Sequence, residues 1–241
     1  MADLICERTD LSDANERLWL ALADQLKLPL TQIARRAELE DSKESAAESL
    51  LNIQQTAGLA LKLIDSYALS VWARQTKLAF EPVSLAAMLR DTADELEPLA
   101  KRYGCRLRLA VARKCEPVMA HSQALSAAFL SLGQVFIEAG SGEAPGQNRV
   151  ITLGSYRSKD GITVGVFGGG DQLTKGIYQR ARLLYGRARQ PFTTLTAASA
   201  TGVFVADSLL GAMSAPLYVA SHQKSKGLAA NFLISHQLRL V

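Results

Sequence analysis

Apolar residues recur at steps of three and four over the first third of the chain, the pattern of an amphipathic helix. A polar stretch, Glu40 to Glu44, interrupts the pattern between two such segments. The apolar positions are Leu11, Leu18, Leu22, Leu26, Pro29, Ile33 and Ala37 before the interruption, and Leu50, Ile53, Ala57, Ala60, Ile64, Ala68 and Val71 after it. Two helices joined by a polar turn predict an antiparallel hairpin. A hairpin cannot bury both stripes alone, so we expect a second copy to complete a dimeric four-helix bundle.

The rest of the chain mixes the periods of helices and strands. Pro82 breaks the helical pattern, and Glu81 to Val83 are interpreted as a linker. The expected elements are a helix from an N-cap at Ser84 to Gly104, a strand at 105–111, a helix at 123–138, two strands within 149–168 around Lys159-Asp160-Gly161, a helix at 201–213, and strands at 216–221 and 228–235. This order predicts an α+β protein with a helical domain (residues 1–80) and a two-layer α/β sandwich (81–241).

Composition excludes several classes of protein. No apolar run approaches the roughly 18 residues of a membrane span, and the first residues lack a signal-peptide stretch, so we expect a cytoplasmic protein without membrane insertion. The three cysteines form no CxxC pair, and the three histidines have no metal-binding spacing, so no metal site is expected. The net charge is +4 and the sequence pI about 9.0, but basic residues are dispersed and aromatics make up only 6%, which argues against nucleic-acid binding.

Three stretches carry a resemblance to a known family. Leu26 to Ile33 resembles the phosphoacceptor box of bacterial sensor histidine kinases, usually His-Glu-Leu-Arg-Thr-Pro-Leu-Thr. Pro82 to Ala100 resembles the first helix of their ATP-binding domain, and Lys226 to Ile234 resembles its terminal hairpin. The resemblance covers nearly the whole chain. It implies a dimerisation hairpin followed by the sandwich that these kinases share with gyrase and the Hsp90 chaperones.

The phosphoacceptor residues of that family are absent from the matching positions. Asp24 stands where the resemblance implies the phosphoacceptor histidine, and Gln25 stands at the adjacent acid. A glutamine cannot take up a proton as a general base does. Leu28 replaces the Thr or Asn used for dephosphorylation. We interpret Asp24 as a solvated surface charge.

The nucleotide-binding positions differ as well. The magnesium-binding Asn of the family falls at Val135, with Ser131 one turn earlier, and valine offers no oxygen to a hard cation. The adenine-reading motif Asp-x-Gly-x-Gly aligns with residues 168–172, so Gly168 replaces the carboxylate, although a shifted register would recruit Asp171 at the cost of the glycine spacing. The remaining degenerate positions are Gly170 in that motif and Gly202 in the second glycine box, where Ala198 and Ala200 replace glycines that admit phosphate.

A glycine triplet, an arginine-rich segment and one histidine can each be interpreted either as a structural feature or as a functional site. Gly168 to Gly170 resembles a phosphate loop but lacks the Lys-Ser/Thr of such loops, so a turn is preferred. The arginines at 180, 182, 187 and 189 fall in the region of the family's ATP lid and are interpreted as a solvated loop. His121 precedes a helix, where capping or exposure is expected.

The resemblance, together with these losses, implies a catalytically inactive pseudo-histidine-kinase. It would act as a dimeric interaction module in signal transduction, with a response-regulator-like receiver as partner and no bound cofactor. Two alternatives stay open: a divergent kinase or phosphotransferase that binds ATP and Mg²⁺ through other residues, and a phosphotransfer protein with an unused ATP domain. Fold alone does not decide between them.

Overall fold

The structure is a computed structural model that describes residues 26, 30, 31, 33, 46–112, 115–139, 149–159, 161–169, 196–223 and 225–233. The chain divides into two compact units, Met1–Val71 and Trp72–Val241, which are described separately. No helix in the described ranges has the length and apolar character needed to span a bilayer.

The first unit contains most of helix α2 (Ala46–Gln75), which confirms the second predicted helix. Of the first predicted helix, the described residues Leu26, Leu30, Thr31 and Ile33 are helical, and the remainder lies outside the described residues. Large apolar side chains of α2 are exposed, including Leu50, Leu61 and Ile64. The dimeric bundle stays a prediction that these exposed side chains favour.

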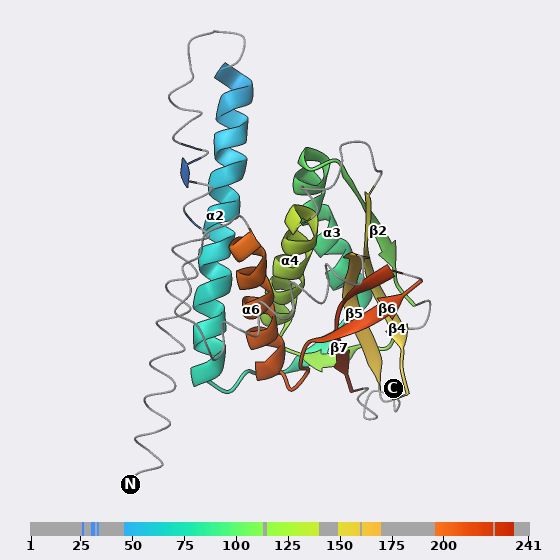
Figure 1. Cartoon of the computed structure of the whole chain (residues 1–241). Coiled ribbons are helices and arrows are strands. Elements are labelled where there is room, and N and C mark those ends of the chain that lie inside the picture. The colour runs from blue at the N-terminus through green and yellow to red at the C-terminus, as the bar shows by residue number, and fades with distance from the viewer. Residues whose placement is uncertain are drawn as a thin grey trace. The chain divides into compact units, whose positions relative to one another are not determined.

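The second unit is a two-layer sandwich, as expected. Helices α3 (Leu85–Arg102), α4 (Ser122–Ala139) and α6 (Thr196–Ala212) cover one face of a five-stranded sheet (Figure 1). The strands are β2 (Cys105–Ala110), β4 (Arg149–Arg157), β5 (Ile162–Gly169), β6 (Tyr218–His222) and β7 (Ser225–Phe232). Their order is β2-β4-β5-β7-β6, with β2 and β4 parallel and the other neighbours antiparallel.

The predicted linker is a strand, and this prediction was wrong. Residues Glu81–Val83 form β1, which pairs antiparallel with β3 (Val118–Ala120), a strand that the sequence did not predict. Proline has no backbone N–H to donate. Pro82 is tolerated in β1 because this strand pairs only with β3, so a residue on its other edge needs no N–H donor.

Helix α3 begins and ends where the sequence predicts. The Ser84 hydroxyl accepts a hydrogen bond from the Ala87 N–H, as an N-cap does. Gly104 follows the helix with a positive φ of 65°, a conformation that favours glycine. The predicted apolar positions are buried, and they are Leu85, Met88, Leu89, Leu96 and Leu99.

Helix α4 is the centre of the core. Its residues from Leu130 to Ile137 are all buried, so the helix is enclosed on every side rather than along one stripe. It packs against α3 and α6. Gly133 lies so close to Leu96 of α3 that a β-carbon there would meet the leucine side chain. This close packing positions the α4 residues of the candidate site.

Candidate functional site

The described residues that the sequence resemblance aligns with nucleotide-binding positions lie on three elements of the second unit. Val135 lies on α4, Gly168 near the end of β5, and Gly202 on α6. Helix α4 contacts both β5 and α6, so the fold brings the three elements together (Figure 1). The other candidates, Asp24, Gln25, Leu28, Gly170, Asp171 and the four arginines, lie outside the described residues.

The two α4 residues that the sequence singled out, Val135 and Ser131, present no free side-chain ligand for a metal ion. Val135 is only 2% exposed and has an apolar side chain. Ser131 is 3% exposed, and its hydroxyl donates a 2.8 Å hydrogen bond to the Ala127 carbonyl one turn earlier. The serine therefore satisfies its proton within the helix. Neither side chain supplies the carboxamide oxygen that the sequence resemblance assigns to the position of Val135.

At the end of β5, the β4 backbone leaves no room for a side chain at Gly168. The pairing of β5 with β7 is irregular between Phe167 and Gly169, and Gly168 has a φ of 158°. A β-carbon at Gly168 would lie 2.9 Å from the Val150 carbonyl oxygen and 3.0 Å from the Ile151 Cα. Because both atoms are backbone, they cannot move aside as a side chain would. An aspartate at this position would clash with β4.

The second glycine box lies inside a helix rather than ahead of one. Helix α6 starts at Thr196, five residues before its predicted start at 201, so Ala198, Ala200 and Gly202 are all helical. From about the fifth residue of a helix, each backbone N–H bonds to the carbonyl four residues earlier. The N–H groups at 200–203 are therefore engaged in the helix and are not available to phosphate. Gly202 is buried.

Glu138 is a candidate that the sequence reasoning missed. It is the only charged residue of α4 and lies one turn beyond Val135, a signal that could have found it. Loss of solvation raises the pKa of its carboxyl to about 7. Desolvation also raises the pKa of Tyr103, and the charge of Glu138 adds to that shift. Glu138 is therefore the one side chain of α4 that has carboxylate oxygens, and it lies one turn from Val135.

Glu138→Gln is expected to stabilise the protein above pH 7 and to leave it unchanged below pH 4.5. The folded carboxyl, with its pKa of about 7, keeps its proton where the unfolded one, at 4.5, has lost it. The native state therefore loses stability as pH rises from 4.5 to 7, and glutamine removes that loss. Urea unfolding at pH 8 should show a gain of about 1–3 kcal/mol. Glu97→Gln is the control, since this residue makes only an exposed ion pair with Lys101. Equal stabilities of wild type and Glu138→Gln at pH 8 would contradict the shift.

His121 caps helix α4, which was one of the two roles expected from the sequence. Its Nδ1 accepts a 3.2 Å hydrogen bond from the Ala124 N–H at the start of α4. Because Nδ1 is the acceptor, the proton of the neutral ring lies on Nε2. Within the described ranges, no three His, Cys, Asp or Glu residues gather to bind a metal ion. Cys105 and Cys115 are free thiols, and burial raises the pKa of Cys115, which lowers its fraction of thiolate.

The sheet face opposite the helices carries an aromatic cluster that the sequence did not reveal. The rings of Tyr156 and His222 stack with centroids 5.3 Å apart, and Phe167 lies 5.2 Å from His222. His222 covers Gly154, where the missing side chain leaves space. Burial and the nearby Arg108 lower the pKa of His222. The cluster packs on itself, and we assign it a structural role in holding β6 on the sheet.

Solved structures match the chain over both units. The full-length ShkA in complex with AMPPNP matches with a TM-score of 0.53 at 15% identity over 91% of this chain. The histidine kinase AdeS from Acinetobacter baumannii matches with a TM-score of 0.50 at 14% identity, over 88% of this chain and 97% of its own. The fold is that of a histidine kinase core. The family resemblance seen in the sequence is thus confirmed at the level of fold.

The structure of a bacterial phosphotransferase also matches, with a TM-score of 0.50 at 12% identity, over 91% of this chain and 96% of its own. The chain spans about half (46%) of the length of ShkA. No protein-family model matches the sequence, and no curated protein sequence matches it either. Similarity at these identities establishes the histidine kinase fold, but whether this chain binds ATP or transfers a phosphoryl group depends on its own residues.

Proposed function

We propose that this protein is a pseudo-histidine-kinase, a signalling protein that keeps the kinase fold and does not carry out phosphoryl transfer from ATP. The observation that carries the proposal is the environment of Gly168. The β4 backbone fills the space that a carboxylate would need there, so this position is built for glycine. An adenine-reading acid at this place in the sheet is incompatible with the packing around it.

Two further losses support the same conclusion. The buried Val135 side chain offers no oxygen to Mg²⁺, and the N–H groups of residues 200–203 in the second glycine box bond within helix α6. Other residues would have to recognise adenine, bind the metal ion and bind the phosphates. The proposed protein therefore uses neither ATP nor Mg²⁺ as a cofactor.

The proposed role is that of a dimeric interaction module in two-component-type signal transduction. The exposed apolar residues of α2, among them Leu61 and Ile64, support dimerisation through the hairpin. The second partner would be a response-regulator-like receiver protein, as the kinase fold suggests. We propose a cytoplasmic location, with neither nucleic acid nor a membrane as partner.

Incubation of the purified protein with radiolabelled ATP and Mg²⁺ tests this role. We expect no label on the chain, because neither Asp24 nor Gln25 provides the imidazole nucleophile of the family. Acid-labile label on a histidine would instead support a divergent kinase. Label released by hydroxylamine would identify an acyl phosphate and make Asp24 an acceptor. Either labelled outcome would overturn the proposal.

A further inference from the structure

Strand β2 forms an open edge of the five-stranded sheet. It pairs on one side with β4 and has no strand on its other side among the described residues. Its six residues keep an unbroken parallel register with β4, from Cys105 opposite Arg149 to Ala110 opposite Gly154. An edge strand of this kind presents unpaired backbone N–H and C=O groups to another chain.

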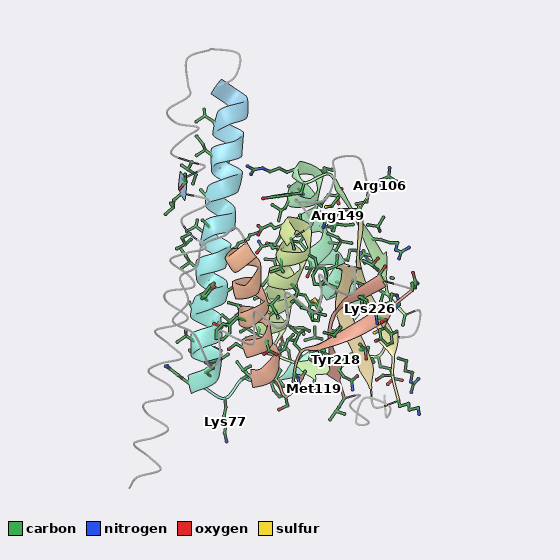
Figure 2. The ribbon with its side chains drawn as sticks, in the orientation of Figure 1. Lys77, Arg106, Met119, Arg149, Tyr218 and Lys226 are labelled. Carbon is green, nitrogen blue, oxygen red and sulfur yellow. The ribbon has the colours of Figure 1, made fainter. Side chains whose placement is uncertain are left out.

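The two faces of this edge differ in chemistry. Leu107 pairs with Ile151, which is buried beneath the helices, so the alternating residues Arg106 and Arg108 lie on the face without helices. Both arginines are exposed, and Arg106 extends outward from β2 (Figure 2). The Nε of Arg108 donates a 3.2 Å hydrogen bond to the Thr152 hydroxyl of β4, which fixes this guanidinium on the sheet.

Apolar side chains accompany these arginines on the edge. Leu109 is 41% exposed, on the face that carries Leu107. Val150 of β4, the register partner of Arg106, is also 41% exposed. The β2 edge therefore combines positive charge with exposed apolar side chains, a combination that suits a partner strand.

Natural proteins protect sheet edges with proline, bulges, very short strands or charged side chains. β2 has no proline or bulge, and Arg106 and Arg108 are its charged residues. The opposite edge, β6, is shorter by one residue and carries His222, which folds back over the sheet. Arginines do discourage one kind of pairing. A second copy of β2 would place arginines beside arginines, which is unfavourable for like charges across strands.

We propose that β2 binds an extended segment of a partner protein in which acidic and apolar residues alternate. Side chains on neighbouring strands lie about 5 Å apart, so an acidic residue of the added strand would meet Arg106, whereas Thr152 holds the Arg108 guanidinium toward β4. The apolar residues of the added strand would contact Leu107 and Leu109 on the other face. Backbone hydrogen bonds to the free edge would supply affinity, and the alternation would supply specificity. This inference rests on the sheet alone and holds whether or not the protein binds ATP.

A labelled peptide of sequence Glu-Val-Glu-Ile-Glu-Val, titrated with the full-length protein, tests the inference by fluorescence anisotropy. We expect saturable binding, with hydrogen exchange of the protein slowed at residues 105–110. A peptide of the same composition in block order, Glu-Glu-Glu-Val-Val-Ile, should bind roughly tenfold or more weakly, since its charges cannot all face the arginines. Equal binding of both peptides, or protection elsewhere, would overturn the proposal.

Charge reversal at Arg106 provides the matched variant. Arg106→Glu should weaken binding of the alternating peptide roughly tenfold, and the charge-swapped peptide Lys-Val-Lys-Ile-Lys-Val should bind this variant better than it binds wild type. The rescue shows that the variant is folded. Arg90→Glu, at an exposed position on α3, makes the same change in net charge and should leave binding intact. Loss of binding in Arg90→Glu, no change in Arg106→Glu, or tighter binding of a single-stranded oligonucleotide at this edge would each overturn the proposal.

Discussion

Light scattering of the purified protein is expected to give about twice the 26.0 kDa mass of one chain, and Ile64→Glu is expected to reduce it to that of one chain. Ile64 is 39% exposed in the single chain, and Leu61 lies one turn before it with a larger exposed surface. A second copy of the hairpin would bury both residues. An unpaired charge in such a seam costs several kcal/mol, about enough to dissociate a dimer of micromolar affinity.

Ile64→Leu is the control for this variant, because it keeps the apolar surface and should keep the dimer. Leu22→Glu should act as Ile64→Glu does, since the apolar stripe of the first predicted helix includes Leu22. Mass measurements over a hundredfold range of concentration separate a weak dimer from a true monomer. A wild-type protein that stays monomeric at every concentration would refute dimerisation through the hairpin.

A second large effect, on the stability of the protein, is expected when the histidine kinase residues are restored at positions 168 and 135. Gly168→Asp, alone or with Val135→Asn, should restore no ATP binding and should destabilise the protein by about 2–4 kcal/mol. The aspartate β-carbon would press on the Val150 oxygen and the Ile151 Cα. Val135→Asn would place a carboxamide at a position that is 2% exposed, which costs about 1–3 kcal/mol if it is left unpaired.

Urea unfolding measures these losses, and two glycine variants give the comparison. Gly168→Ala isolates the effect of the β-carbon and should account for most of the loss caused by Gly168→Asp. Gly211→Ala, on α6, meets no atom within 4 Å and should be neutral or stabilising, as alanine is preferred in helices. Micromolar ATP binding by the double variant, or undiminished stability of Gly168→Asp, would show that the position is not built for glycine.

Much of the second unit could be predicted from the sequence because its signals are local. Ser84 precedes a helix whose apolar face repeats at steps of three and four, and the structure buries that face. Strands β1 and β3 were missed because three residues carry no usable period and their pairing joins segments far apart in the chain. The early start of α6 was missed because the family pattern favoured a glycine loop, whereas Ala197, Ala198 and Ala200 favour a helix.

In the candidate site, too, local sequence features could be predicted and features that depend on tertiary packing could not. The assignment of the family's magnesium ligand to Val135 and of its adenine carboxylate to Gly168 is a prediction from the sequence resemblance alone. The reason that Gly168 must be glycine could not be predicted, because it depends on an irregular pairing beside β4 that only the three-dimensional structure contains. The raised pKa of Glu138 likewise depends on burial, which periodicity indicates only for apolar residues.

The absence of ATP·Mg²⁺ binding is the central claim, and calorimetry combined with thermal unfolding at 1 mM nucleotide tests it most directly. Loss of the adenine carboxylate alone would weaken ATP binding roughly ten- to hundredfold, and loss of the metal and phosphate contacts would weaken it further. With a Kd of about 1 mM or weaker, ligand would stabilise the fold by only about 0.4 kcal/mol, whereas a micromolar Kd would give about 4 kcal/mol. We expect no binding heat and no appreciable shift in Tm. Saturable binding at micromolar ATP, with a Tm rise of several degrees, would contradict the pseudokinase and favour a divergent kinase.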